Sequence, residues 1–193
     1  PNQNLFSLTG DIINGMKPVL EEFKPDYVLV HGDTTTSTAA ALAAFYAGAK
    51  VGHVEAGLRT YNKLAPFPEE LNRQLTGKIA DLHLSPTSMS KDNLMSEKTA
   101  EESIVVTGNT VIDALLESVN IVNSIEGNKD IDTLKEIIDT NKKLVVVTGH
   151  RRENHGQGFL NICAALNTIA QRKDVQVIYP VHLNPNVQKP VYS

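Results

Sequence analysis

Short strand-like runs alternate with helix-like segments along the chain, and this alternation limits the fold more than any other sequence feature. Strands are predicted at residues 27–30, 50–55, 82–85, 104–107, 144–148 and 175–179, and helices at 11–23, 34–47, 69–80, 88–98, 110–125, 131–141 and 156–172. Most of the strands are continuous apolar runs, which are typical of parallel sheets buried on both faces. The sequence therefore predicts an α/β fold in which helices cover both faces of parallel sheets.

The predicted strands fall into two groups, separated by residues 109–141, where only helices are expected. We expect an N-terminal Rossmann-like domain at residues 1–108 and the start of a C-terminal, nucleotide-binding Rossmann-like domain at residues 109–193. The second group is too small for a complete sheet, and the first group opens directly on a helix. Both domains are therefore expected to be incomplete, and the chain is expected to be the central part of a longer protein.

Composition excludes several classes of protein. The chain has 193 residues, of which 41% are hydrophobic, enough to bury a core without disulfides or a structural metal. A formal net charge of −4 without a basic face argues against nucleic-acid binding. The single cysteine, Cys163, excludes a disulfide framework and fits a reducing compartment. No apolar run approaches the roughly 18 residues of a membrane span. We therefore expect a cytoplasmic protein with neither nucleic-acid nor membrane partners.

Two acidic residues follow neighbouring predicted strands, where ligands bind in open parallel sheets. Asp33 comes after the first strand, and Glu55 closes the second. Carboxylates at such an edge suit general acid or base chemistry. Simpler interpretations stay open: Asp33 as the N-cap of the next helix, and Glu55 in an ion pair with Arg59. His53, inside the second strand, is expected to be a hydrogen-bonded core histidine.

A third acidic segment opens the helix predicted at residues 69–80. Glu69 and Glu70 suit the helix dipole in its first turn, and Pro68 before them is ordinary at a helix start. Neither acid needs a function to explain it. Near the end of the chain, His182 follows the last predicted strand. Its segment is interpreted either as a further site or as a capped turn.

The segment after the most strongly apolar strand favours a phosphate group. It contains His150, Arg151, Arg152 and Glu153, followed by Gly156 and Gly158 and a predicted helix. Backbone N–H groups at a helix start and arginine side chains bind anions. The glycine spacing is not that of a dinucleotide-binding loop, so a phosphate ligand without nicotinamide is indicated, with a solvated loop as the alternative. The six histidines lack the helical pairing of a metal site, so no metal is expected.

Five motifs stand in order between residues 26 and 187, and together they closely resemble those of the bacterial non-hydrolysing UDP-N-acetylglucosamine 2-epimerases. The motifs are His31-Gly32-Asp33-Thr34, His53-Val54-Glu55-Ala56-Gly57-Leu58-Arg59, Pro68-Glu69-Glu70-x-Asn72-Arg73, Thr107-Gly108-Asn109-Thr110 and Thr148-Gly149-His150-Arg151-Arg152-Glu153. The resemblance implies two Rossmann-like domains that face a cleft, the glycosyltransferase-B arrangement. The family's N-terminal and C-terminal phosphate-binding segments have no counterpart here, so the chain alone is expected to be inactive.

The resemblance also implies a reaction and the residues that perform it. UDP-GlcNAc and UDP-ManNAc would be interconverted by elimination and re-addition of UDP, supplying cell-surface polysaccharide precursors without a cofactor. Asp33, Glu55 and Glu69 become acid/base candidates, and His150 a catalytic residue that contacts the diphosphate. Arg151, Arg152 and Glu153 join His150 as substrate-binding candidates. Arg59 and His182 are candidates for an allosteric site that holds a second UDP-GlcNAc, and we expect a homodimer.

Three other functions stay open at this stage. A UDP-sugar glycosyltransferase can use the same two-domain fold, but it would need an acceptor site and no cluster of three carboxylates. A hydrolysing relative would release UDP and free ManNAc. A nucleotide-sugar sensor without catalysis is a third alternative, which the retained site residues disfavour.

Overall fold

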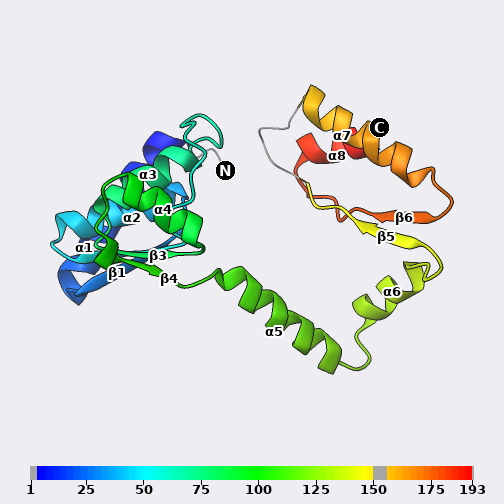
Figure 1. The fold of residues 1–193 in the computed structure, drawn as a ribbon, viewed down its shortest axis with the longest axis horizontal. Helices are drawn as coiled ribbons and strands as arrows, with labels where there is room; N and C mark the ends of the chain where they lie inside the picture. The colour runs from blue at the N-terminus through cyan, green and yellow to red at the C-terminus, as the bar shows by residue number, and fades with distance from the viewer. Residues whose placement is uncertain (1–3, 150–155, 193) are drawn as a thin grey trace. The chain divides into compact units, whose positions relative to one another are not determined.

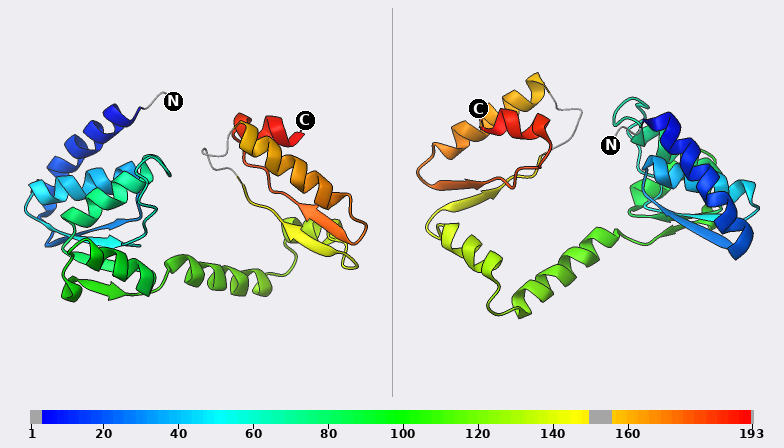
Figure 2. Two further views of the ribbon diagram at one scale, coloured as in Figure 1. Left: turned by 45° about the horizontal axis from the view of Figure 1, so that its top comes forward. Right: turned by 180° about the vertical axis from the view of Figure 1, so that it is seen from behind.

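The computed structural model describes residues 4–149 and 156–192. The chain divides into two compact units, Pro1–Ser118 and Val119–Ser193 (Figures 1 and 2). Strands and helices alternate in both units, and all pairs of neighbouring strands are parallel. The predicted α/β fold with parallel sheets is therefore confirmed.

The first unit is built on a four-stranded sheet whose strands lie side by side in chain order. They are β1 (Tyr27–His31), β2 (Lys50–Val54), β3 (Leu82–Ser85) and β4 (Ile104–Val106). The register aligns Val30 with His53, His53 with His83, and His83 with Ile104. Because all four strands run in one direction, their carboxyl ends share one edge of the sheet.

Four helices accompany this sheet: α1 (Leu5–Phe23), α2 (Thr35–Tyr46), α3 (Glu69–Ile79) and α4 (Ser88–Ser96), with the short 3₁₀ helix η1 (Glu101–Ser103) before β4. Helix α2 is rich in alanine, and its small side chains allow close approach to the strands. Ala41 and Ala44 are fully buried against Val30 and Val51. Leu94 of α4 packs with Ile104 of β4 in a second buried cluster.

Helices cover one face of this sheet in the described part of the chain, not both faces as predicted. The helices lie on one side of the strands (Figure 1). Val30, Val51 and Ile104 are buried, whereas Leu29 and Val105, which alternate with them along the strands, are 66% and 47% exposed. The cause is the strand order. Right-handed connections that always step in the same direction place every connecting helix on the same side of a sheet. The sequence pattern showed that these strands are apolar on both faces but not their order.

The second unit contains a two-stranded parallel sheet, β5 (Lys143–Val146) and β6 (Val175–Ile178). Helix α5 (Thr110–Ser124) spans the division between the units, and α6 (Lys129–Ile137), α7 (Gln157–Ala170) and α8 (Pro185–Tyr192) complete the chain. Phe159, Val175 and Val187 are buried here. Helix α8 was not predicted, because it has only eight residues and contains Pro190 as well as its first residue, Pro185. In the described residues, no helix has the length and apolarity to cross a membrane.

Candidate active site

The carboxyl ends of β1 and β2 bring two predicted acids to the same edge of the sheet. The Gly32 amide donates to the Val54 carbonyl at 3.0 Å, which extends the pairing of the strands by one residue. Asp33 follows Gly32, and Glu55 follows Val54. A Cβ atom added to Gly32 would lie 3.4 Å from Oε2 of Glu55, so the Glu55 carboxylate lies over the turn that carries Asp33. This edge is where the sequence placed both side chains.

Glu55 adopts a backbone conformation that is rare for its residue type. Its φ is +66°, in the left-handed region that disfavours side chains with a Cβ. Strain of this kind persists only where the surrounding structure enforces it, and it clusters at functional sites. The carboxylate is 30% exposed. Its Oε1 accepts from Asn109 Nδ2 at 3.3 Å, and its Oε2 lies 3.7 Å from Nε2 of His31.

Asp33 does not cap helix α2, which corrects the simpler interpretation of this residue. The N-cap is Thr34, whose hydroxyl accepts from the Ser37 amide at 3.2 Å. The Asp33 carboxylate instead accepts from Nη2 of Arg73 at 2.6 Å. Because a charged hydrogen bond this short restricts both partners, the bond fixes Asp33 at the edge of the sheet.

Glu70 lies in the first turn of α3, where an acid suits the helix dipole, but its contacts go well beyond that interaction. Its side chain is fully buried, and it accepts hydrogen bonds from the Thr60 amide at 3.0 Å and the Tyr61 amide at 3.1 Å. Gln74 Nε2 donates at 2.8 Å, and Nη1 of Arg73 lies 3.5 Å away. Burial alone would raise the pKa of the Glu70 carboxyl, but these donors and Arg73 outweigh it and hold the pKa below its usual value.

Glu69 precedes Glu70 and has different surroundings. It is the first residue of α3, directly after Pro68, and its side chain is half-buried. Within residues 4–149 and 156–192 its carboxylate forms neither a hydrogen bond nor an ion pair. Of the three predicted acid/base candidates, Glu69 is therefore the one whose carboxylate is not already engaged by another described side chain.

Arg59 pairs with Glu97 and not with Glu55, which corrects the second simpler interpretation. Its Nε and Nη2 donate to the two Glu97 oxygens at 2.7 and 2.9 Å, and Nη1 donates to the Leu58 carbonyl. The Arg59 side chain is fully buried. The hydrogen bond from Arg59 is the main reason that the pKa of Glu97 lies below its usual value. The predicted role of Arg59 in binding a second ligand stays a prediction.

His53 is a hydrogen-bonded core histidine, as predicted. It is fully buried, and its Nε2 lies 2.8 Å from the Gly32 carbonyl oxygen, beneath the turn that carries Asp33. Burial lowers the pKa of His53 to about 4. Its register partner His83 is also buried, and burial lowers the pKa of that side chain too. Both imidazoles are therefore neutral at physiological pH.

The predicted phosphate-binding residues His150, Arg151, Arg152 and Glu153 lie outside the described residues. The preceding strand β5 is present, and the Tyr179 hydroxyl donates to the Gly149 carbonyl at 2.5 Å. His182 lies in a turn before α8, where its Nδ1 accepts from the Asn184 amide at 3.1 Å. This hydrogen bond is compatible with the capped-turn interpretation of that segment, and the predicted ligand-binding role of His182 stays a prediction.

Four residues near the two acids had no predicted role. Arg73, Glu70, Asn109 and His31 all belong to motifs that the sequence analysis singled out. Arg73, Asn109 and His31 reach the two acids from segments far apart in the chain, whereas Glu70 meets Arg73 on the same helix. The i,i+3 spacing of Glu70 and Arg73 on one helix was the available signal for their pairing. Among the described residues, no cluster of three or more potential metal ligands is present.

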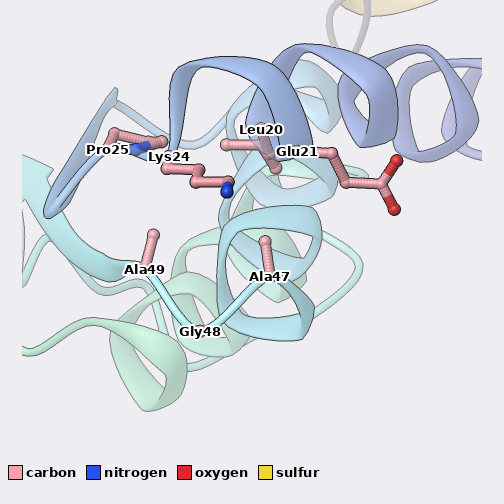
Figure 3. Close-up of a pocket in the computed structure, with 7 residues that line it drawn as sticks. All are labelled: Leu20, Glu21, Lys24, Pro25, Ala47, Gly48 and Ala49. Atoms are coloured by element: carbon pink, nitrogen blue, oxygen red, sulfur yellow. The ribbon is translucent and has the colours of Figure 1, made fainter.

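An open hollow of about 600 Å³ lies in the first unit, away from this edge (Figure 3). Leu20 and Lys24 of the α1 end line it together with Pro25 and Ala49, which precede β1 and β2. It is therefore at the amino ends of the strands, opposite Asp33 and Glu55. Its lining offers no buried polar group that would orient a ligand.

Comparison with known proteins decides the family. The sequence model described as UDP-N-acetylglucosamine 2-epimerase matches residues 1–193. The chain belongs to the UDP-N-acetylglucosamine 2-epimerase family. It is 54% identical to the UDP-N-acetylglucosamine 2-epimerase of Yersinia pestis over 193 residues, which cover 99% of this chain and 51% of that protein. The resemblance of the five motifs to UDP-N-acetylglucosamine 2-epimerases is thereby confirmed.

Solved structures of family members have the same fold. The Neisseria meningitidis UDP-GlcNAc 2-epimerase bound to UDP-GlcNAc matches with a TM-score of 0.93 and 49% identity, over 99% of this chain and 52% of that chain. The Methanocaldococcus jannaschii UDP-GlcNAc 2-epimerase in complex with UDP-GlcNAc and UDP matches with a TM-score of 0.79 and 33% identity, over 99% of this chain and 51% of that chain. The chain spans about half the length of the relatives it matches.

Proposed function

We propose that the protein containing this chain interconverts UDP-GlcNAc and UDP-ManNAc by eliminating UDP and adding it back. The observation that carries the proposal is the pair of carboxylates at one sheet edge, Asp33 held by Arg73 and Glu55 held over Gly32. Family membership supports the substrate class, since the N. meningitidis and M. jannaschii relatives are bound to UDP-GlcNAc, the latter also to UDP.

The chemistry explains why several acids are needed. The C2–H bond of the sugar is not acidic enough for simple deprotonation, so a base removes the proton while UDP leaves from C1. The C–H electron pair forms a C1=C2 double bond, and the C1–O electron pair leaves with UDP. The products are 2-acetamidoglucal and UDP. Re-addition of UDP at C1 accompanies delivery of a proton to the opposite face of C2, which requires acid/base groups on both faces.

In this proposal Asp33, Glu55 and Glu69 are the acid/base groups. Glu69 is supported by its unengaged carboxylate, and Glu55 by its strained backbone and its partner Asn109. Close carboxylates titrate as a set, so a pH profile reports the set and not one acid. No metal or redox group is required, because the bond that breaks joins C1 to a good leaving group.

The diphosphate is assigned to the segment that follows β5. His150 would assist the departure of UDP, with Arg151, Arg152 and Glu153 in the substrate site. Arginine forks match the geometry of phosphate oxygens. Residues 1–108 and 109–193 would then belong to two Rossmann-like domains, the second of which binds the nucleotide. His182 is assigned to binding a second UDP-GlcNAc. The predicted part of Arg59 in binding that ligand would require its fully buried side chain to leave Glu97.

The wider setting of the activity completes the proposal. The enzyme would act without hydrolysing its substrate, as a homodimer in the cytoplasm, and supply precursors of cell-surface polysaccharides. The single cysteine supports a reducing compartment.

Product analysis tests the proposed reaction against its alternatives. The full-length protein that carries this chain is incubated with UDP-GlcNAc, and the products are identified by NMR. The proposal predicts a mixture of UDP-GlcNAc and UDP-ManNAc. Stoichiometric UDP and free ManNAc would indicate a hydrolysing enzyme instead. UDP release only when an acceptor sugar is added would indicate a glycosyltransferase.

A further inference from the structure

Glu70 is a fully buried acid for which the proposed chemistry has no use. Among the described residues it is the only acidic residue that is fully buried. Burying a carboxylate is unfavourable unless it is paired and hydrogen-bonded. Its partners therefore indicate what the residue does, and one of them, Arg73, also holds Asp33.

We propose that Glu70 is a positioning residue for the acid/base chemistry: it fixes the guanidinium of Arg73, and Arg73 fixes the carboxylate of Asp33. The inference rests on the proposed function, because it assigns Glu70 to the reaction for which Asp33 is a candidate. Glu70 itself contacts neither substrate nor reacting atoms in this assignment.

The Arg73 guanidinium bridges Glu70 and Asp33. Nη1 lies 3.5 Å from Glu70 Oε2, and Nη2 lies 2.6 Å from Asp33 Oδ2, so each end of the guanidinium faces one acid. The Arg73 side chain is only 11% exposed. Its Nε is buried and has no hydrogen-bond partner in the described part of the chain. The orientation of this planar group thus depends on the two carboxylates.

The Glu70 carboxylate is itself held in place by its surroundings. Two amides of the preceding loop, from Thr60 and Tyr61, and the Gln74 side chain all donate to its oxygens at 2.8–3.1 Å. Glu70 and Arg73 are three residues apart on α3, so they share one helix face. The loop amides and the helix together hold the Glu70 carboxylate in place. Glu70 in turn restrains the Arg73 guanidinium, which binds Asp33 in the turn after β1.

A purely structural role for Glu70 is the competing explanation, because the same carboxylate also ties down the loop at residues 60–61. The two roles predict different coupling to Arg73. A loop anchor acts whether or not Arg73 is present. If Glu70 is a positioning residue, substituting it affects turnover only while Arg73 binds Asp33 in its native geometry.

A double-mutant cycle in the full-length protein separates these roles, using Glu70→Gln, Arg73→Lys and the double variant. Glutamine keeps only one of the two acceptor oxygens, so it can accept from one loop amide but not from both, and it removes the charge that faces Arg73. Lysine replaces the guanidinium fork with a point charge. We measure kcat and KM for UDP-GlcNAc and the Kd of UDP. We expect Glu70→Gln to lower kcat by about 10²-fold, the loss typical of a reacting group displaced by about 1 Å, here the Asp33 carboxylate. KM and the Kd of UDP should be unchanged. In the Arg73→Lys background the same substitution should have no further effect on kcat.

The matched control is Glu101→Gln, which removes a carboxylate from the Lys91–Glu101 ion pair of the same unit, joined at 2.7 Å. Its kcat should equal that of the wild type. If the effects of Glu70→Gln and Arg73→Lys on kcat multiply independently, or if Glu70→Gln weakens UDP binding as much as turnover, the positioning role is wrong. Should Glu70→Gln not fold, Glu70→Asp takes its place in the same cycle, because it keeps the charge but shortens the reach by one methylene.

An unfolding cycle makes the inference testable independently of turnover. Glu70→Gln and Asp33→Asn are combined, and the urea midpoints are compared. We expect the shift of the double variant to differ from the sum of the single shifts, and this coupling to vanish in the Arg73→Lys background. A wild-type protein without turnover would contradict the proposed function, and additive midpoint shifts would contradict the contact between Glu70 and Asp33 through Arg73.

Discussion

The Asn109 side-chain amide donates to the Glu55 carboxylate at 3.3 Å and so joins the end of β4 to the end of β2 across the intervening strand β3. Each residue belongs to a different motif, and the two are 54 positions apart in the chain. The contact holds one oxygen of Glu55 in place while the other lies toward His31. An acid restrained in this way can keep one orientation as substrate enters and leaves.

Replacement of Glu55 by glutamine is expected to remove turnover and spare nucleotide binding. Glutamine has nearly the same shape, but it cannot accept or deliver a proton as a carboxylate does. The loss of kcat should be about 10²–10⁴-fold, the usual contribution of a positioned acid or base, and the Kd of UDP should be unchanged. Steady-state kinetics and isothermal titration measure both. Equal losses of binding and rate would mean that Glu55 has a structural role.

The strained backbone of Glu55 allows a second test at the same position. Glycine is free to adopt a φ of +66°, so Glu55→Gly should relieve strain of about 1 kcal/mol while removing the carboxylate. We expect a protein at least as stable as the wild type in urea unfolding but without turnover. A destabilised Glu55→Gly variant would show that the side-chain contacts of Glu55 outweigh its backbone strain.

Thr34 and Asp33 are adjacent residues with separable roles. Thr34→Ala removes the N-cap of α2 and should lower the free energy of unfolding by about 1 kcal/mol, with little effect on kcat. Asp33→Asn, in contrast, should lower kcat strongly, because it removes a proposed acid/base group. Chemical denaturation and turnover of the two variants provide the comparison. If Thr34→Ala leaves stability unchanged, the capping assignment is wrong.

Gly57 is expected to tolerate no side chain. Its φ is +93°, and an added Cβ would overlap the Ser90 carbonyl oxygen of α4. Gly57→Ala should therefore lower the free energy of unfolding by more than the roughly 1 kcal/mol expected from backbone strain alone. Gly108→Ala is the matched control, because Gly108 has a φ of +80° but no described atom within 4 Å of an added Cβ. Equal losses of stability in the two variants would contradict the predicted clash.

Stability is expected to fall as the pH drops from about 6.5 to about 4. The unfolded chain protonates His53 near its ordinary pKa of 6.5, whereas in the folded state burial lowers the pKa of His53 to about 4. Because the unfolded state binds more protons in this window, acid favours it, by about 3 kcal/mol at most for this side chain. His83, Arg59 and Asp33 are the charged or titratable groups that act on His53.

Urea unfolding at a series of pH values measures this dependence, with His53→Gln as the comparison. Glutamine does not titrate and can still donate toward the Gly32 carbonyl. The variant should show a flatter dependence between pH 4 and 6.5, with a remaining slope from His83, whose pKa is also lowered by burial. The same slope in the wild type and the variant would mean that His53 does not drive the acid sensitivity.

The parts of the fold that depend on local pattern were predictable from the sequence. The apolar runs predict the four strands before Gly108 and the two after it. The parallel arrangement predicts that Asp33 and Glu55 lie at the same edge of the sheet. The single covered face was not predictable, because it depends on the spatial order of the strands. Helix α8 was missed because prolines replace the usual apolar periodicity.

The partners of the acids were the less predictable part of the candidate site. The sequence suggested Asp33 as a cap and Arg59 as the partner of Glu55, since both interpretations use neighbours in the chain. The structure instead pairs Asp33 with Arg73 and Arg59 with Glu97, 40 and 38 positions away. Long-range ion pairs of this kind follow from packing, and no spacing rule in a single sequence specifies them.

The central claim is that C2 of the sugar loses and regains its hydrogen. The most direct test is incubation of the full-length protein with UDP-GlcNAc in deuterated water, followed by NMR at C2. We expect the C2 proton signal to disappear, the UDP-ManNAc formed to carry deuterium at C2, and Glu55→Gln to abolish both changes. UDP-ManNAc formed with its original C2 hydrogen, or a wild-type protein that leaves the C2 signal intact, would contradict the proposed elimination and re-addition.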